Sequence, residues 1–492
     1  MWKETVTVNK KSKIYAFNTH YEINDYELGD FKDLEYKLTY HDWVGYSHIP
    51  RFFYDESKKI LYIPRGVDSY ILENWSHQQI TAIENKDTTI NIGFNLLTKP
   101  RDLTQEKAIR YLTGDGEFQS TKFDTQKILI MPPGTGKTYC TISAIQKLHT
   151  RTLIIVHNTN LKHQWIDKFI EYTNMTKDNI VDISSSKKLS DYMKTAPDDK
   201  SMVFVTSRRL LISYMEKYGM DSLNKVIKKL GVGLKVFDEA HKEYRATFLI
   251  DYATNVKRTI YLTATFALSN YQDNSVFQTS YKMVRKLKIT PDDNFRHISY
   301  ISVLFNSHPS DIDVFRVEGK KRGFDRFEYI DYELSKGILE NELRDLLDFF
   351  KVKNKLDGKI LILSSKKSTC DFFKEVINDQ LPDIESCSIY TDNKVEDYKH
   401  YEAISATPAM LGTGEDIPGL RFMFNTEPGR SLTNTDQFSG RLRPYMGGAK
   451  TTYYVEFVDV GFTSITSMYK TRLKLLKTKV KECLELDKTF HR

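Results

Sequence analysis

Cysteine is scarce in this sequence. Four of the 492 residues are cysteine, and their spacing is not that of metal ligands. They are Cys140, Cys370, Cys387 and Cys483. This usage argues against a zinc site and against a disulfide framework, and it is typical of reduced thiols in a reducing compartment.

Long hydrophobic runs are also missing. No apolar stretch approaches the roughly 20 residues that a membrane helix needs, and residues 1–5 lack the apolar core of a signal peptide. The mean hydropathy of −0.48 and the 40% share of hydrophobic residues are those of a soluble globular protein. We therefore expect a cytoplasmic protein without a membrane partner.

Neither sign of charge dominates the chain. Lysine and arginine number 72 against 65 aspartates and glutamates, which gives a net charge of +7. This bias is compatible with a polyanionic partner, although a solvated basic face is the commoner cause of such an excess. The length exceeds that of one ordinary core, so we expect roughly two to four domains.

A glycine-rich segment stands out among the features that are present. Residues 131–140 read MPPGTGKTYC, follow the apolar run 127–130 and lead into a helical pattern. The order of strand, glycine loop and helix predicts a phosphate-binding loop, even though Met131 stands where the usual pattern has glycine. A glycine turn after a buried strand is the simpler alternative.

Each part of this loop has a chemical task. Gly134 and Gly136 would let backbone N–H groups turn toward phosphate oxygens at the positive end of the next helix. Lys137 would reach the β- and γ-phosphates of ATP, and the Thr138 hydroxyl would ligate Mg²⁺. The predicted nucleotide-binding residues of the loop are Pro133, Gly134, Thr135, Gly136, Lys137 and Thr138.

A glutamine precedes a helical segment upstream of the loop. Gln105 carries a side-chain amide with one donor group and one acceptor. Such an amide could pair with an adenine, and a solvent-facing helix glutamine is the alternative.

Short apolar runs recur at regular intervals after the loop, with helical patterns between them. They occupy residues 153–156, 202–205, 234–237 and 260–262. Alternating strands and helices predict a parallel sheet covered on both faces, with ligands at the carboxyl ends of the strands.

The third of these runs ends in an acidic cluster, Asp238, Glu239, Ala240 and His241. A carboxylate at the end of a buried strand can bind Mg²⁺ directly or through water, and we assign this task to Asp238. Glu239 would then polarise the attacking water. A buried strand followed by an acidic helix cap would read the same, but its coincidence with the phosphate loop favours the catalytic interpretation.

The second half of the chain repeats the alternation without a second phosphate loop. Its pattern runs from residue 297 to residue 458, and residues 463–486 read as a basic amphipathic helix. Residues 437–443 contain Arg441 and Arg443. Guanidinium is permanently charged and shaped for phosphate, so these arginines suit the task of reaching a γ-phosphate. Solvated surface arginines are the alternative.

Residues 1–95 hold no nucleotide motif but are rich in aromatic residues, and residues 51–63 read as a β-hairpin. Cations interleaved with aromatic rings suit phosphate pairing and base stacking. The cations near this hairpin are Arg51, Lys58, Lys59 and Arg65. We predict a small β-rich accessory domain that binds DNA, and a purely structural aromatic core is the alternative.

Taken in order, these motifs resemble those of the superfamily 2 helicases with a DEAH motif. The resemblance implies an α/β fold with two RecA-like parallel-sheet lobes in tandem, preceded by a small β-rich N-terminal accessory domain, with ATP between the lobes. We place the accessory domain at residues 1–95, the first lobe at residues 96–294, and the second lobe with a C-terminal helix at residues 295–492.

The resemblance also assigns roles to residues that the patterns alone leave open. The catalytic residues that it implies are Lys137, Asp238, Glu239, Gln437, Arg441 and Arg443. The further nucleotide-binding residues are Gln105 and Asp416. The nucleic-acid-binding residues are Gln164, Trp165, Thr206, Ser207, Ser364 and Thr407. Pro444 stands where the family usually has its second arginine, so the choice between Arg441 and Arg443 stays open.

Within the family, the motifs are similar to those of phage recombination and fork-remodelling helicases of the UvsW type and of the helicase subunits of restriction enzymes. We therefore expect an ATP-dependent DNA helicase or translocase that acts on single-stranded, forked, branched or duplex DNA in recombination, repair or fork remodelling. The same resemblance implies a phage-encoded monomer or weak oligomer in a bacterial cytoplasm. An RNA helicase and a motor subunit of a restriction-type complex are the alternatives.

Overall fold

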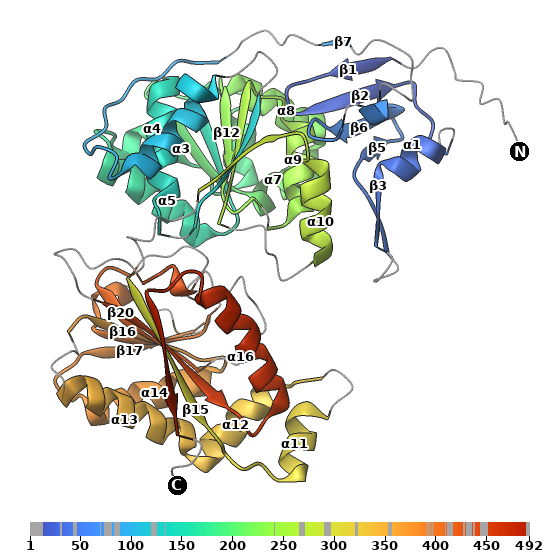
Figure 1. Cartoon of the computed structure of the whole chain (residues 1–492). Coiled ribbons are helices and arrows are strands. Elements are labelled where there is room, and N and C mark those ends of the chain that lie inside the picture. The colour runs from blue at the N-terminus through green and yellow to red at the C-terminus, as the bar shows by residue number, and fades with distance from the viewer. Residues whose placement is uncertain are drawn as a thin grey trace, which may run out of the picture. The chain divides into compact units, whose positions relative to one another are not determined.

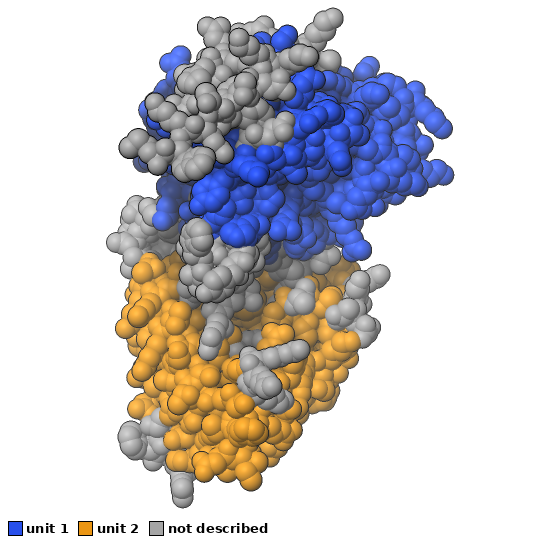
Figure 2. Space-filling view, turned by 90° about the vertical axis from the view of Figure 1, so that its right-hand side faces the viewer, with its two compact units in different colours: residues 1–290 blue, residues 291–492 orange. Residues whose placement is uncertain are grey.

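The computed structural model divides into two compact units, residues 1–290 and residues 291–492 (Figure 1, Figure 2). The structure describes residues 13–29, 32–42, 47–68, 70–72, 81–82, 89–119, 125–132, 134–240, 242–264, 271–289, 297–319, 323–352, 357–390, 393, 395, 397–408, 410, 417–426, 429, 435, 438–442 and 451–488.

The first unit begins with a small, mainly antiparallel sheet of strand order β5-β6-β2-β1-β7. Its strands are β1 (Ile14–Ala16), β2 (His20–Asn24), β5 (Phe53–Asp55), β6 (Ile60–Pro64) and β7 (Thr81–Ala82). The other elements of this region are helix α1 (Lys32–Lys37) and a ribbon of β3 (Thr39–Asp42) and β4 (Ser47–Pro50). The predicted hairpin is confirmed, because β5 pairs antiparallel with β6 and Phe53 lies opposite Tyr62.

A seven-stranded parallel sheet of order β10-β11-β9-β12-β13-β8-β14 forms the centre of the first unit. Its strands are β8 (Gln126–Ile130), β9 (Thr152–Val156), β10 (Ile180–Asp182), β11 (Val203–Ser207), β12 (Leu234–Phe237), β13 (Arg258–Thr263) and β14 (Arg285–Lys288). The predicted apolar runs correspond to β8, β9, β11, β12 and β13. The sequence patterns did not predict β10 or the edge strand β14.

Helices cover both faces of this sheet. They are α3 (Leu103–Thr113), α4 (Lys137–Leu148), α5 (Thr159–Tyr172), α6 (Ser186–Asp191), α7 (Arg208–Tyr218), α8 (Met220–Lys229), α9 (Tyr244–Ala253) and α10 (Tyr271–Ser280), with short 3₁₀ helices at Gly116–Phe118 and Lys177–Asn179. Along β9, Leu153 and Ile155 belong to one hydrophobic cluster while Ile154 and Val156 belong to another. Because successive strand side chains point to opposite faces, these clusters are the two cores of the sheet.

The N-terminal sheet shares one of these cores. Ile49 and Tyr62 are buried in the same cluster as residues of α7, α8 and α9, and β6 lies beside α9 in the fold (Figure 1). The small sheet is therefore packed onto the parallel sheet's helices rather than joined to them by a linker alone.

The second unit repeats the parallel architecture with the strand order β17-β18-β16-β19-β20-β15-β21. Its strands are β15 (Ile298–Phe305), β16 (Lys359–Leu363), β17 (Ser386–Ile389), β18 (Ala403–Ala406), β19 (Leu420–Asn425), β20 (Thr452–Asp459) and β21 (Glu482–Asp487). Its helices are α11 (Asp311–Glu318), α12 (Arg326–Lys336), α13 (Ile338–Val352), α14 (Lys367–Gln380) and α16 (Thr463–Leu476), with a 3₁₀ turn at Tyr398–His400.

The prediction for the C-terminal segment is partly wrong. Residues 463–486 were expected to form one helix, but α16 ends at Leu476 and β21 follows, paired in parallel with β15. The sequence of β21 is ECLELD, in which Leu484 and Leu486 lie two residues apart, as on one face of a strand.

The predicted fold class is confirmed. Each unit contains the parallel α/β sheet of a RecA-like lobe, and a β-rich sheet precedes the first of them. Among the described helices, none combines the length and the apolar composition that a membrane crossing would require.

Candidate nucleotide-binding and hydrolysis site

The glycine loop connects β8 to α4 through two glycines in the left-handed region. Gly134 has a φ of 81° and Gly136 a φ of 98°, which residues with a Cβ rarely adopt. A Cβ at Gly136 would also lie 2.3 Å from Gln105 Nε2. Because α4 begins at Lys137, the loop leads directly to a helix N-terminus, where phosphate binding is favourable.

Gln105 is buried against this loop, and both ends of its amide contact the backbone. Its Oε1 accepts the backbone N–H of Arg101 at 2.8 Å, and its Nε2 donates to the carbonyl of Thr135 at 3.1 Å. The side chain therefore braces the phosphate loop. Its contact with adenine stays a prediction.

Lys137 and Glu239 come together from distant parts of the sequence. Lys137 Nζ lies 3.4 Å from Glu239 Oε1, and the side chains are only 12% and 10% exposed. Lys137 starts α4, whereas Glu239 follows the end of β12. Two predicted catalytic residues thus share one nearly buried site in the first unit.

Asp238 completes this site, and both of its carboxylate oxygens accept hydrogen bonds. Oδ2 accepts the indole N–H of Trp165 at 2.9 Å, and Oδ1 accepts the backbone N–H of Glu239 at 2.9 Å. Burial and then the negative charge of Glu239 raise the pKa of the Asp238 carboxyl above its ordinary value, while Lys137 and the Trp165 bond act in the opposite direction.

Trp165 occupies a place that the sequence patterns did not anticipate. It was predicted to contact nucleic acid, but its side chain is 1% exposed and donates to Asp238. A contact with nucleic acid would require the indole to leave the core. In the structure, Trp165 orients the carboxylate that is predicted to bind Mg²⁺.

Thr138 and Asp238 are the residues that would hold Mg²⁺. A hydroxyl and a carboxylate supply the hard oxygen atoms that this ion prefers, and Mg²⁺ usually takes one or two carboxylates and completes its shell with water and phosphate oxygens. The chemistry of this donor set therefore fits the ion.

The predicted nucleic-acid residues of the first unit differ in accessibility. Gln164 is half-buried on α5. Thr206 is fully buried, and its hydroxyl donates to the carbonyl of Ile183 at 3.3 Å. Ser207 Oγ accepts the backbone N–H of Leu210 at 3.3 Å and so caps α7. The hydroxyls of Thr206 and Ser207 thus serve the fold in this structure.

In the second unit, Ser364 and Thr407 follow the adjacent strands β16 and β18. The backbone N–H of Ser364 donates to the carbonyl of Ala406 at 3.1 Å, which places Ser364 beside the residue preceding Thr407. Both are buried, with exposed fractions of 0% and 9%. The structure thus brings this predicted pair together at the carboxyl ends of two adjacent strands.

Arg441 is 4% exposed within the second unit, so the interpretation as a solvated surface arginine is wrong for this residue. Its backbone N–H donates to the carbonyl of Phe438 at 3.0 Å. The predicted residues that lie outside the described part of the chain are Pro133, His241, Asp416, Gln437 and Arg443.

Two of the N-terminal cations bind the helices of the parallel sheet. Arg51 Nη1 donates to the carbonyl of Thr279 in α10 at 3.2 Å, and Lys58 Nζ lies 2.8 Å from Asp221 of α8. These contacts dock the small sheet onto its neighbour.

The other two N-terminal cations contact residues of the small sheet's own region. Lys59 Nζ lies 2.5 Å from a carboxylate oxygen of Glu27, and the guanidinium of Arg65 lies 4.4 Å from the centre of the Tyr21 ring. Each cation predicted to bind DNA therefore contacts a protein group in the structure.

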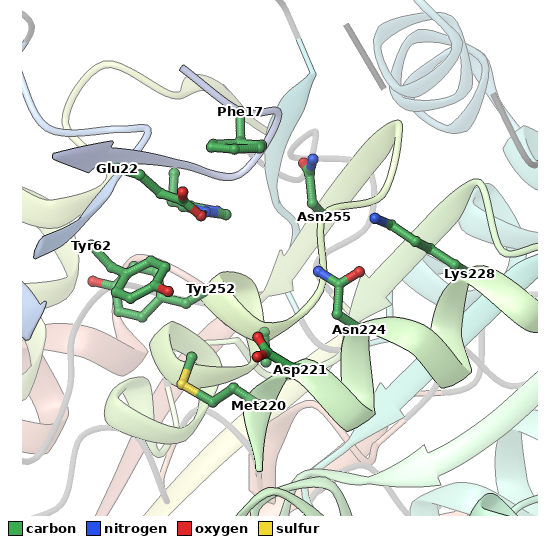
Figure 3. Close-up of a pocket in the computed structure, with 11 residues that line it drawn as sticks. Phe17, Glu22, Tyr62, Met220, Asp221, Asn224, Lys228, Tyr252 and Asn255 are labelled. Carbon is green, nitrogen blue, oxygen red and sulfur yellow. The ribbon is translucent and has the colours of Figure 1, made fainter. Parts of the chain in front are cut away.

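A pocket of about 80 Å³ lies between the small sheet and helices α8 and α9 (Figure 3). The rings of Tyr62 and Tyr252 lie 5.9 Å apart at its wall, and Glu22, Asn224 and Lys228 add polar groups. A cavity that binds benzene has about 150 Å³, and a water molecule takes about 30 Å³. The pocket therefore has room for a few waters rather than for a nucleobase.

The fold and the site define a class of protein: an α/β protein with a phosphate loop, and with a lysine and two carboxylates at the ends of parallel strands. Residues 74–268 match the profile of the family described as the type III restriction enzyme res subunit.

Two similar curated proteins are named as helicases. The chain is 26% identical over 175 residues to the general transcription and DNA repair factor IIH helicase/translocase subunit XPB of Encephalitozoon cuniculi, covering 36% of this chain and 23% of that protein. It is 26% identical over 150 residues to the DNA 3'-5' helicase XPB of Kineococcus radiotolerans, covering 30% of this chain and 25% of that protein.

The chain thus spans about a quarter of the length of these curated relatives. Among solved structures, the helicase domain of Pyrococcus furiosus Hef is similar with a TM-score of 0.47 and 14% identity, covering 75% of this chain and 97% of that one. The family match and the curated relatives thus show a similarity to helicases that covers residues 74–268 and segments of 150 to 175 residues, respectively.

Proposed function

We propose that this chain is an ATP-driven DNA helicase or translocase. The observation that carries the proposal is the convergence of Lys137, Glu239 and Asp238 in one nearly buried site, in a chain whose relatives are helicases. In this proposal the Glu239 carboxylate accepts a proton from water as the water oxygen attacks the γ-phosphorus of ATP, and ADP leaves.

The other residues of the site bind the nucleotide or orient the catalytic groups. Lys137 neutralises charge on the transferred phosphoryl group, and the loop N–H groups hold the β-phosphate. Mg²⁺, held by Thr138 and Asp238, would neutralise the phosphate oxygens when bound. Trp165 keeps the Asp238 carboxylate in one orientation through its indole hydrogen bond.

The proposed substrate is DNA, because the curated relatives are named as DNA helicases or as a DNA repair helicase/translocase subunit. From the relative named as a 3'-5' helicase we propose the same polarity here. The motif resemblance to UvsW-type proteins supports forked or branched DNA as the preferred substrate, in phage recombination, repair or fork remodelling.

A motor subunit of a restriction-type complex is the second candidate. The family match over residues 74–268 favours it, since that family is described by such a subunit. Unwinding of a fork by the purified chain alone supports the first candidate. ATP hydrolysis that drives unwinding only after partner subunits are added supports the second.

The test of the motor is ATP hydrolysis measured with single-stranded, duplex and forked DNA and with RNA. We expect stimulation by DNA in the wild type and a loss of at least about 10² to 10³ in kcat for Lys137→Ala, because a charge-stabilising group is removed from the transition state. Lys147→Ala is the control, as Lys147 lies in the last turn of the same helix. Near wild-type turnover of Lys137→Ala would refute the proposed function.

A further inference from the structure

Arg208 is a fully buried arginine. Its side chain ends at the turn that follows β12, which includes Asp238, Glu239 and Lys242 and is called the acidic turn below. Arg208 is the first residue of α7 and is 0% exposed. Its Nη1 donates to the carbonyl of Lys242 at 2.7 Å, and its Nη2 donates to the carbonyl of Glu239 at 3.0 Å and to that of Asp238. One guanidinium therefore holds three carbonyls of the turn.

The backbone of this turn is strained at the same place. Glu239 has a φ of 47° and Glu243 a φ of 51°, a left-handed conformation that is unfavourable for residues with a Cβ. Such strain persists at functional sites when surrounding contacts determine the backbone strongly. The carbonyls that Arg208 binds include that of Glu239 and that of Lys242, the residue before Glu243.

Fold stability alone gives a weak reason for burying this charge. The hydrogen bonds that Arg208 donates to described residues go to backbone carbonyls. Burial lowers its pKa to about 10, and the charges of Glu243, Asp238 and Glu239 act in the opposite direction. A buried charge is costly to desolvate, and apolar replacement of buried ionic groups is often neutral or stabilising. The role of the guanidinium therefore lies in the backbone segment that its hydrogen bonds hold.

We propose that Arg208 is a positioning residue for ATP hydrolysis. By holding the carbonyls of Asp238, Glu239 and Lys242, it keeps the strained turn in place and so aims the Glu239 carboxylate at the attacking water. This inference rests on the proposed function and assigns a role to a residue outside the predicted site.

The chain contains a matched control for this inference. Arg151 is also 0% exposed, and it also donates to three backbone carbonyls, those of Leu230, Asp198 and Asp199. It precedes β9, at the amino ends of the parallel strands, whereas the acidic turn follows the carboxyl end of β12. Loss of either arginine removes a buried guanidinium, but only Arg208 binds the turn.

The experiment compares Arg208→Met, Arg208→Lys and Arg151→Met. For Arg208→Met we expect a kcat lower by about 10²-fold, with the KM for ATP changed by less than about threefold, because misplacing a catalytic group by about 1 Å costs this much. Arg208→Lys should recover part of the loss, since an ammonium can still donate to the turn. Arg151→Met should retain kcat within about twofold.

A second readout is independent of hydrolysis. The indole N–H of Trp165 donates to Asp238, so its ¹⁵N-indole resonance, assigned with Trp165→Phe, reports the position of the turn. We expect this resonance to shift in Arg208→Met and to stay unchanged in Arg151→Met. If Arg208→Met does not fold, the same comparison is made with Arg208→Lys.

The outcomes separate this inference from the proposed function. An active wild type whose Arg208→Met variant keeps its kcat and its Trp165 resonance overturns the positioning role only. Equal losses in Arg208→Met and Arg151→Met also overturn it, because they would show a general packing effect. A wild type without ATP hydrolysis refutes the proposed function, and the Trp165 resonance then still decides whether Arg208 fixes the turn.

Discussion

Glu239 contacts Lys137 through its side chain and Arg208 through its carbonyl. Replacing Glu239 by glutamine keeps the size of the side chain but removes its ability to accept a proton. We expect Glu239→Gln to bind ATP and to lose at least about 10² to 10⁴ in kcat, the usual contribution of a general base.

The measurement is the binding of a fluorescent ATP analogue beside single-turnover hydrolysis. Glu171→Gln, on the exposed side of α5, controls for the substitution. A Glu239→Gln variant that cannot bind the analogue would show that Glu239 supports the nucleotide site rather than the hydrolysis step.

The motif predicts that an arginine of the second unit reaches the γ-phosphate of ATP. Our preferred assignment from the motif is Arg443, and Arg441 is the alternative. Alanine at the true γ-phosphate arginine should leave ATP affinity nearly intact and lower kcat by about 10³ or more. Arg441 is buried, so Arg441→Ala has to be checked for thermal stability as well. A kinetic defect confined to Arg441→Ala would show that Arg441, and not Arg443, reaches the γ-phosphate. Arg344→Ala on α13 is the control for the loss of an arginine side chain.

At the scale of the elements, buried strands could be predicted from the sequence and edge strands could not. Strand β9 is buried at all five positions and reads as an apolar run. The edge strand β14 reads RKLK and alternates between half-buried and exposed positions, so its composition resembles that of a surface loop. Strand β21 follows helix α16 in the sequence. A helical pattern read over both segments therefore conceals the two-residue spacing of Leu484 and Leu486.

Prediction of the candidate site was limited in a similar way, since residues within motifs could be found but contacts between distant residues could not. Lys137, Asp238 and Glu239 could be predicted, because local motifs with a fixed chemical meaning contain them. The bond from Trp165 to Asp238 joins residues 73 positions apart, and Arg208 reaches its carbonyls from 30 to 34 positions away. No local pattern encodes such contacts, since packing of separate elements produces them.

The packing of α12 against β20 buries an acidic residue and gives an element-scale prediction. Glu333 of α12 is 0% exposed. Burial and then the negative charge of Asp459 raise the pKa of Glu333 well above the ordinary value of 4.5. A raised folded-state pKa means that the folded state binds more protons than the unfolded state above pH 4.5, so stability falls as the pH rises.

We therefore expect Glu333→Gln to become increasingly more stable than the wild type as the pH rises from 5 toward the folded-state pKa, by up to about 1.4 kcal/mol per pH unit. Thermal unfolding of both proteins at pH 5, 6, 7 and 8 measures the difference. Glu340→Gln on α13 controls for the loss of one formal charge. A stability difference that does not change with pH would contradict the argument.

At the scale of the whole molecule, the N-terminal sheet belongs to the core of the first unit. Tyr62 is 7% exposed and lies in the same cluster as Phe248 and Tyr252 of α9. Its ring also lies 6.0 Å from that of Phe53. Phe53, an aromatic residue of the predicted hairpin, is thus packed against this core together with Tyr62, which favours a structural role for the hairpin.

The prediction is that Tyr62→Ala destabilises the small sheet and α9 together. Removing a buried aromatic ring costs roughly 3 to 5 kcal/mol, and the lost contacts belong to both sides of the shared core. Native-state hydrogen exchange should therefore become faster in β6 (Ile60–Pro64) and in α9 (Tyr244–Ala253). Strand β16 (Lys359–Leu363) of the second unit is the internal reference and should not change.

Tyr62→Phe is the matched variant, because it keeps the ring and removes only the hydroxyl, and we expect it to exchange nearly as the wild type does. Faster exchange in β6 alone would mean that the small sheet opens independently of its neighbour. The region could then move as a separate domain, and a role in DNA selection would regain support. Faster exchange in both segments ties the small sheet to the core of the first unit, and DNA selection would then have to be sought in other surfaces of the chain.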